Sequence, residues 1–110
     1  MEVPNATVVP TYDTLGTLKQ LDIWISTQSP LGVKAAAAAL VPAGVVINVH
    51  TTLLGGGLGR KIETDYAIHA VKTALGLKTP VKVIWPREED ISHDQYRPMA
   101  LSREIGRAHV

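Results

Sequence analysis

Residues 55–60 read Gly-Gly-Gly-Leu-Gly-Arg, and this short segment has the residue types and spacing best suited to binding a ligand. Glycine loses more backbone freedom on folding than any other residue, so clustered glycines usually mark positive φ angles or a close approach of the backbone to another group. An apolar, β-branched run at 45–49 precedes the segment, and a helical pattern follows it. A loop between a strand and a helix can direct its N–H groups at an anion or a polar heterocycle. From the residues alone, a sharp turn without a ligand explains the glycines equally well.

Two common nucleotide-binding patterns are absent from this segment. The dinucleotide-binding pattern G-x-G-x-x-G would need a third glycine where Arg60 stands. The phosphate-binding pattern G-x-x-x-x-G-K-[ST] fails at the same residue and lacks the Ser or Thr that should follow. Arg60 and Lys61 could meet a phosphate or a substrate carboxylate, or they could be ordinary surface charges, and the residue types favour neither interpretation.

Other polar residues favour structural roles. Asn48 and His50 stand on the predicted strand before the glycine segment, and we expect hydrogen-bonded structural residues there in preference to cofactor contacts. His69 lies off the apolar stripe of its predicted helix and is expected at the surface. Because adjacent residues on an extended chain point in opposite directions, His93 and Asp94 are not expected to act as an acid–base pair.

The composition narrows the classes of protein and site. No pair of His or carboxylate residues has the spacing of metal ligands. The sequence contains no Cys, which excludes disulfides, zinc–thiolate sites and iron–sulfur ligation by this chain. A net charge of +1 gives no electrostatic case for nucleic acid or an anionic membrane. No apolar run is long enough for a membrane span, and the first residues lack the basic and apolar regions of a signal peptide.

The hydrophobic periodicity predicts an α/β (α+β) fold in the order β-β-α-β-α-β, with two helices packed on a mixed sheet. Strands are expected at 6–9, 21–25, 45–49 and 81–85, and helices at 30–41 and from 63 or 64 to about 75. Ser29 and Pro30 fit the first positions of the earlier helix. Gly76 fits the residue that ends the later one.

Three features carry expectations about burial. The apolar run 45–49 suits a strand that is buried on both faces. Trp24 and Trp85 each end a predicted strand and are expected to pack in the core. The charged stretch 87–90 follows Pro86, and it is typical of a solvated face or of the start of a helix.

The end of the sequence has a different character. Residues 104–110 resemble a translated sequencing adapter, so we expect a non-native tail there. With 110 residues, the chain is long enough for one small domain. Residues 1–103 are therefore expected to belong to one domain, followed by this tail.

Several segments, in the right order, resemble the xanthine dehydrogenase and aldehyde oxidase family. Residues 55–61 resemble its G-G-G-F-G-[RG]-[RK] loop, and 24–30 resemble its element of a strand, Thr-Gln and a helix. Residues 1–6 are similar to M-E-P-x-N-A, and 81–91 are similar to P-V-K-V-x-W-T-R-E-E-D. Residues 93–98 are similar to H-D-x-Y-R-P, which indicates the branch of β subunits that includes isoquinoline 1-oxidoreductase.

The resemblance implies that residues 1–103 are part of a molybdopterin-binding domain. The family inserts oxygen from water into a C–H bond of an aldehyde or an N-heterocycle. Its bacterial members use the cytosine dinucleotide form of molybdopterin, and a small subunit with two [2Fe–2S] clusters removes the electrons. The implied partners are that subunit, the remainder of the chain's own subunit and a small-molecule substrate, in the bacterial cytoplasm or periplasm. The residues expected to contact the cofactor are Gln28, Gly55, Gly56, Gly57, Leu58, Gly59 and Arg60.

The sequence also departs from the family's pattern. Leu58 stands where the family usually has Phe, and a Leu side chain cannot stack over a cofactor as a ring does. Ile62 stands where purine-specific members carry Glu, so purine recognition by that residue is not expected. The family's catalytic base is a Glu in a later glycine-rich motif that this chain lacks. We therefore expect an incomplete oxidoreductase subunit with no catalytic residue of its own, and the alternative is a small non-catalytic α/β module that binds a phosphate-containing ligand at the glycine segment.

Overall fold

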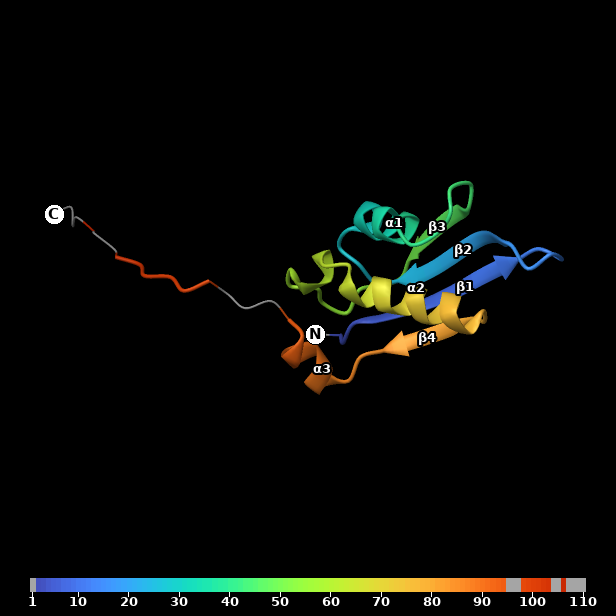
Figure 1. Cartoon of the computed structure of the whole chain (residues 1–110). Coiled ribbons are helices and arrows are strands. Elements are labelled where there is room, and N and C mark those ends of the chain that lie inside the picture. Colours follow the sequence, from blue (N-terminus) through green and yellow to red (C-terminus); the bar gives the residue numbers. More distant parts are fainter. Residues whose placement is uncertain (1, 95–97, 104–105, 107–110) are drawn as a thin grey trace.

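The computed structural model describes residues 2–94, 98–103 and 106, and within them it contains one mixed sheet with helices. The strands are β1 (Asn5–Tyr12), β2 (Leu18–Ile25), β3 (Val46–Thr51) and β4 (Val81–Ile84). The helices are α1 (Pro30–Ala38), the 3₁₀ turn η1 (Arg60–Ile62), α2 (Asp65–Leu77) and α3 (Arg87–Ser92) (Figure 1). The predicted fold class and element order are confirmed, with α3 added at the end. The predicted tail at 104–110 lies almost wholly outside the described residues and stays a prediction.

The described strands form a sheet in the order β3-β2-β1-β4. β1 is antiparallel to both β2 and β4, so Val8 pairs with Ile23 on one side and Val81 on the other. β3 is parallel to β2 and follows it after α1. This crossover brings the carboxyl ends of β2 and β3 to the same edge of the sheet, which is where ligands bind in open α/β sheets.

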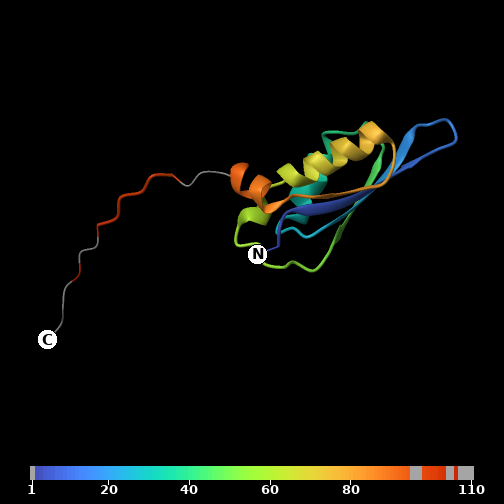
Figure 2. The same ribbon diagram turned by 90° about the horizontal axis from the view of Figure 1, so that it is seen from below.

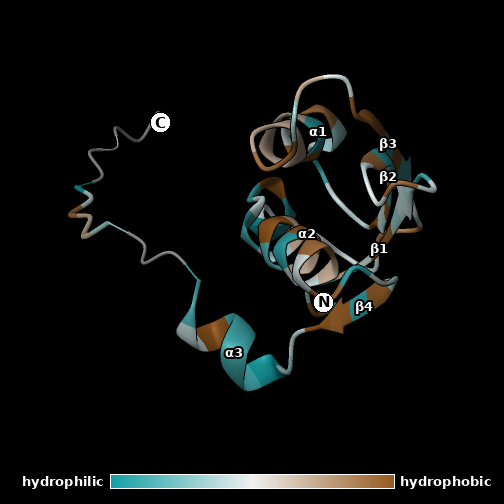
Figure 3. Cartoon of the chain, turned by 45° about the vertical axis from the view of Figure 1, so that its right-hand side comes forward, coloured by the Kyte–Doolittle hydropathy of each residue, from teal (hydrophilic) through white to brown (hydrophobic). Residues whose placement is uncertain are grey.

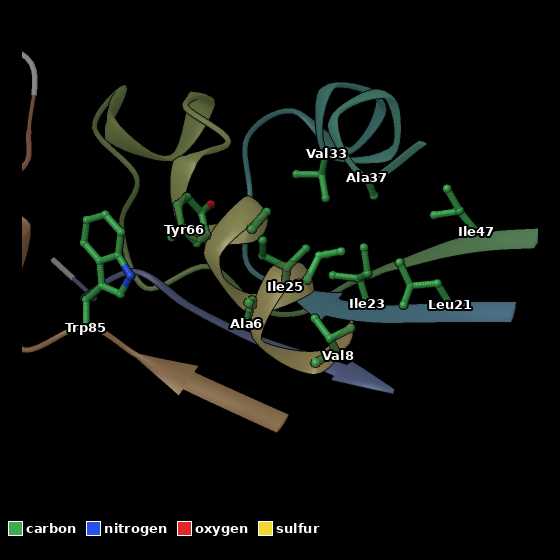
Figure 4. Close-up of a cluster of buried hydrophobic side chains, with 14 residues drawn as sticks. Ala6, Val8, Leu21, Ile23, Ile25, Val33, Ala37, Ile47, Tyr66 and Trp85 are labelled. Carbon is green, nitrogen blue, oxygen red and sulfur yellow. The ribbon is translucent and has the colours of Figure 1, made fainter. Parts of the chain in front are cut away.

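The core lies between the sheet and the two longer helices, which share one face (Figure 2). Alternate residues of β1 and β2 point into it, as a period of two requires. Its buried hydrophobic side chains are Ala6, Val8, Leu21, Ile23, Ile25, Val33, Ala37, Ile47, Tyr66, Ala67, Ala70, Val71, Ala74 and Trp85 (Figure 4). The predicted apolar stripe of the second helix is confirmed, because Ala67, Ala70, Val71 and Ala74 are all buried.

Two expectations about burial are wrong, because the described helices cover only one face of the sheet and β3 lies at its edge. Val46 is 55% exposed, so the strand is not buried on both faces. Figure 3 shows hydrophobic residues on both edge strands, β3 and β4. Trp24 points to the face without helices, is 38% exposed and stacks on His50 with ring centroids 4.7 Å apart. Trp85 is 7% exposed and packs in the core as predicted.

Several element boundaries also differ from the predicted ones. β1 continues through Pro10, which is tolerated because β4 stops pairing at Val8 and leaves that side of β1 open. α1 ends at Ala38, before the predicted position 41. Gly76 lies inside α2, and the residue in the left-handed conformation after that helix is Lys78, with φ +53°.

Candidate functional site

The glycine segment forms the loop between β3 and η1, at the carboxyl edge of the two parallel strands. The Thr52 N–H donates to the Ile25 carbonyl at 3.0 Å, so the loop leaves the sheet beside the end of β2. The chain that leaves β2 carries Gln28, and its N–H donates to the Lys61 carbonyl at 3.0 Å. The residues just after β2 and those just after the glycines are therefore bonded to each other.

Gln28 is the predicted residue that contacts the loop most closely. Its Oε1 accepts a hydrogen bond from the Gly59 N–H at 3.0 Å. The Gln28 side chain also lies against Gly57, where a Cβ atom would overlap the amide group. Gly57 is therefore required by close approach of a side chain from the same protein, which the sequence reasoning did not anticipate.

The hydrogen bond to Gly59 also fixes which way the Gln28 amide faces. Because Oε1 accepts from a backbone donor, the Nε2 group must occupy the other position. Gln28 is exposed, and its Nε2 has no hydrogen-bond partner among the residues that the structure describes. Two oriented N–H donors are thus presented beside the loop, ready for an oxygen-rich ligand.

Glu2 holds the other end of the loop, and the sequence reasoning gave this residue no role. The Gly55 N–H donates to Glu2 Oε2 at 2.8 Å, and the Glu2 N–H donates to the Gly55 carbonyl at 2.8 Å. A Cβ atom at Gly55 would lie 2.9 Å from the Glu2 Cβ, so a larger residue does not fit. The only sign of Glu2 in the sequence was its place in the segment 1–6 that resembles the family.

The second Glu2 oxygen connects the loop to a buried polar network. Glu2 Oε1 accepts from Asn5 Nδ2 at 2.6 Å and from the Ser26 hydroxyl at 3.0 Å, and it lies 3.5 Å from Lys61 Nζ. Lys61 Nζ donates to the Ser26 Oγ at 2.9 Å. The hydrogen bond from Asn5, followed by those from Gly55 and Ser26 and the charge of Lys61, lowers the pKa of Glu2 to about 2. Glu2 is therefore ionised at neutral pH and compensates a buried cation.

Backbone angles account for the remaining glycines. Gly56 has φ +84° and Gly59 has φ +89°, values that glycine adopts without steric cost. Leu58 also has a positive φ, +50°, and its side chain is 86% exposed. Within the part of the chain that is described, the N–H groups of Gly56 and Leu58 have no hydrogen-bond partner. Contacts and backbone angles inside the chain thus explain every glycine of the loop, and its centre still offers free donors.

The Arg60 side chain points away from the loop surface into the protein. It makes a bidentate hydrogen bond to Asp65, with N···O distances of 3.0 and 2.9 Å. Arg60 Nε also lies 3.4 Å from Asp90 Oδ1 and 3.1 Å from Asp94 Oδ1. The guanidinium stands 5.4 Å from the centre of the Trp85 ring, within cation–π range. Asp65 first, and the other two carboxylates after it, raise the pKa of Arg60 further.

The expectations for the two cations after the glycines therefore need correction. Arg60 is 7% exposed and Lys61 is fully buried, so neither is a surface charge. Each is already paired with carboxylates of this chain, which leaves neither side chain available to a phosphate or a substrate carboxylate. Lys and Arg are rarely buried unless they are paired, and the sequence alone does not show which carboxylates pair with Arg60 and Lys61.

The predicted structural residues on β3 do have structural partners. Asn48 Nδ2 donates to Asp22 Oδ1 at 3.3 Å, and His50 Nε2 lies 3.1 Å from the same oxygen. The hydrogen bond with His50 is the main cause that lowers the pKa of Asp22. The predicted structural role of both residues is confirmed.

The two later histidines lie around Trp85, away from the loop. His69 is exposed, as predicted, and stacks on Trp85 with centroids 5.5 Å apart. His93 Nδ1 is 3.0 Å from Glu89 Oε2, and Asp94 turns to Arg60, so the two neighbours do not pair with each other. A shallow hollow of about 100 Å³ lies among His69, Trp85, Glu89 and His93. Among the described residues, no group of three His, Asp or Glu side chains gathers as metal ligands would.

Comparison with known proteins identifies the loop's family. The sequence model of the molybdopterin cofactor-binding domain matches residues 1–107. This chain belongs to the molybdopterin cofactor-binding domain family. The recognition made from the glycine segment and its flanking motifs is confirmed, and a molybdopterin-binding domain is the setting of Gln28 and the loop.

Three relatives show the breadth of this family. The chain is 31% identical over 104 residues to isoquinoline 1-oxidoreductase subunit beta of Brevundimonas diminuta, which covers 94% of the chain and 13% of that relative. It is 41% identical over 70 residues to a membrane-bound aldehyde dehydrogenase (pyrroloquinoline-quinone) of Gluconacetobacter polyoxogenes, covering 62% of the chain and 9% of the relative. It is 29% identical over 94 residues to aldehyde oxidase 2 of Macaca fascicularis, covering 83% and 7%.

The chain therefore spans a small part of the length of each of these relatives. They are oxidoreductases by name, and they come from both bacteria and a mammal, so the predicted bacterial origin stays a prediction. No helix within the described ranges is long and apolar enough to cross a membrane.

Proposed function

We propose that this chain is a fragment of the molybdenum-cofactor-binding subunit of a hydroxylase that oxidises an aldehyde or an N-heterocycle, with water as the oxygen source. The family match over residues 1–107 supports the cofactor. The names of the relatives support the substrate classes, because one is an isoquinoline oxidoreductase and another an aldehyde oxidase. The cytosine dinucleotide form of the cofactor and a partner subunit with [2Fe–2S] clusters belong to the same proposal.

The observation that carries this proposal is the orientation of Gln28. Its Oε1 is occupied by the Gly59 N–H, so both Nε2 protons are left for a ligand. The unpartnered N–H groups of Gly56 and Leu58 add two backbone donors nearby. A molybdopterin carries phosphate, pterin and metal-bound oxygen acceptors, and a surface of neutral donors suits that chemistry.

When bound, the molybdenum cofactor supplies the centre at which the substrate is oxidised, and this chain's residues orient it. The Gln28 Nε2 group and the N–H groups of Gly56 and Leu58 would donate hydrogen bonds without ligating the metal. Among the described residues around this loop, no side chain is free to act as general base, since Glu2 is ionised but engaged by its own partners. The general base is therefore expected elsewhere in the subunit, and the fragment alone should be inactive.

The alternative is a small module that binds a phosphate-containing ligand at the glycine loop. Such a module would gain most of its affinity from the neighbouring cations. Arg60 and Lys61 are instead buried against Asp65 and Glu2, so no basic side chain of the loop is free for a phosphate. The geometry therefore favours the hydroxylase fragment.

A matched pair of glycine variants in the complete subunit tests the proposed site. Gly59 and Gly16 both have positive φ, +89° and +80°, and a Cβ atom at either would meet nothing within 4 Å. Gly59→Val and Gly16→Val therefore carry a similar backbone cost, but Gly16 lies in the distant turn between β1 and β2. We expect Gly59→Val to lose molybdenum and turnover and Gly16→Val to keep both. Equal metal content and equal rates in the two variants would remove the support for this site.

A further inference from the structure

Glu2 contacts both ends of the glycine loop. At the first end, its carboxylate accepts from the Gly55 N–H and its own N–H donates to the Gly55 carbonyl, both at 2.8 Å. At the other end, Lys61 follows the loop directly and its Nζ lies 3.5 Å from Glu2 Oε1. One side chain from the N-terminal segment is therefore bonded to residues on both sides of the loop.

The connection through Lys61 is buried at its lysine end, and the Glu2 side chain is 30% exposed. Lys61 and Ser26 are both fully buried, and the Ser26 hydroxyl donates to Glu2 Oε1 while its oxygen accepts from Lys61 Nζ. A buried ammonium needs a compensating charge and hydrogen-bond acceptors, and Glu2 and Ser26 provide them. The spacing between Glu2 and Lys61 is thus fixed by the core.

The Gly55 contact is also fixed by sterics. A Cβ atom at Gly55 would lie 2.9 Å from both the Glu2 Cβ and Glu2 Oε2, so the glycine allows the carboxylate to reach the backbone. The Gly55 N–H is held by the Glu2 carboxylate, and the Gly55 carbonyl is held by the Glu2 N–H. That carbonyl shares its peptide unit with the Gly56 N–H, so the second bond also orients one of the loop's unpartnered donors.

We propose that Glu2 is a positioning residue, which joins the two ends of the glycine loop and holds its free N–H groups in their binding arrangement before any ligand arrives. Preorganisation of this kind lowers the entropy cost of binding, because the loop does not have to be ordered by the ligand. The ligand's identity rests on the proposed function, but the role of Glu2 in ordering the loop does not.

Amide hydrogen exchange of the full 110-residue chain, followed by NMR, tests this role without any cofactor. The variant is Glu2→Gln, which keeps the size of the side chain but removes the charge, and the control is Glu88→Gln on the exposed face of α3. We expect exchange of the Gly55 amide, which donates to the Glu2 carboxylate, to rise about tenfold in Glu2→Gln. Exchange of the Ile23 amide in the sheet should stay unchanged, and Glu88→Gln should match the wild type.

Two outcomes would overturn the proposal. One is unchanged exchange of the Gly55 amide in Glu2→Gln, and the other is an equal rise at Ile23, which would show a general loss of stability. A second measurement needs no variant: the Gly55 amide proton shift of the wild-type chain should titrate with a midpoint near the Glu2 pKa of about 2. A midpoint near 4.5, the ordinary value for a Glu, would contradict the proposed contact between the Glu2 carboxylate and the Gly55 N–H. Because neither measurement involves the cofactor, their failure would leave the proposed function to be tested separately.

Discussion

Gln28 and Gly59 stand 31 positions apart in the sequence, and the Gln28 Oε1 accepts the Gly59 N–H at 3.0 Å. This hydrogen bond connects the chain leaving β2 to the loop leaving β3. It also leaves the Gln28 Nε2 protons turned outward. The two predicted parts of the site are thus one unit, although nothing in their spacing indicated that they touch.

The contact between Gln28 and Gly57 predicts the effect of a single methyl group. In Gly57→Ala the new Cβ would overlap the Gln28 amide, so that side chain must move and its bond to Gly59 is lost. We expect a loss of about 0.5–1.5 kcal/mol in the free energy of unfolding, measured in urea, because the exposed Gln28 side chain can move away but gives up its hydrogen bond. Gly76→Ala is the control, since it lies in α2 with nothing within 4 Å and should gain about 0.5–1 kcal/mol. Equal effects at the two positions would contradict the close approach.

Arg60 is surrounded by the carboxylates of Asp65, Asp90 and Asp94. Its replacement is therefore expected to have a large effect on the stability of the fold. Removing the guanidinium in Arg60→Ala leaves the buried Asp90 Oδ1 without a cation, while Asp90 Oδ2 keeps its contact with Arg87 at 3.0 Å, so we expect a loss of about 1–3 kcal/mol in chemical denaturation. Arg60→Lys should restore little, because an ammonium cannot make the bidentate bond to Asp65. Lys72→Ala on the exposed side of α2 should change stability by less than about 0.5 kcal/mol. A loss under about 1 kcal/mol in Arg60→Ala would show that the cluster does not stabilise the fold.

The low pKa of Glu2 predicts the pH dependence of stability. Its pKa is about 2 in the folded chain against an ordinary 4.5, so its contribution is fully present above pH 4.5. That contribution is lost as the pH falls toward 2, because the unfolded chain takes up the proton first. Glu2→Gln should therefore flatten the fall in stability across this window. Asp13 and Asp22 also have lowered pKa values, so part of the slope should remain, and an unchanged slope would contradict the assignment.

The periodic parts of the fold could be predicted from the sequence. The alternation at 21–25 and the stripe of Ala and Val in α2 both indicate which side chains are buried. They can be recognised from the order of hydrophobic and polar residues within each segment. The edge position of β3 could not be predicted, because a β-branched apolar run fits either an edge or a central strand. The exposure of Trp24 could not be predicted for a different reason, because a position at a strand end does not tell which face of the sheet is covered.

The site was predictable in part. Gln28 and the glycine loop were found through their resemblance to a family. A family motif identifies the residues of a site, but it does not show which of them are in contact. The burial of Arg60 depends on Asp65, Asp90 and Asp94, and the role of Glu2 depends on Ser26 and Lys61. Except for Arg60 and Asp65, which are five positions apart, these pairings join residues that are far apart along the chain, and neither spacing nor propensity indicates them.

Molybdenum content of the complete subunit carrying Gln28→Glu tests the central claim most directly. Glutamate keeps an oxygen that can accept the Gly59 N–H, but it removes both Nε2 donors that face the proposed ligand. We expect the metal and pterin content per subunit to fall about tenfold or more, with the thermal unfolding of the fold little changed. A Gln28→Glu subunit that retains its full molybdenum content and activity would contradict the account of this site.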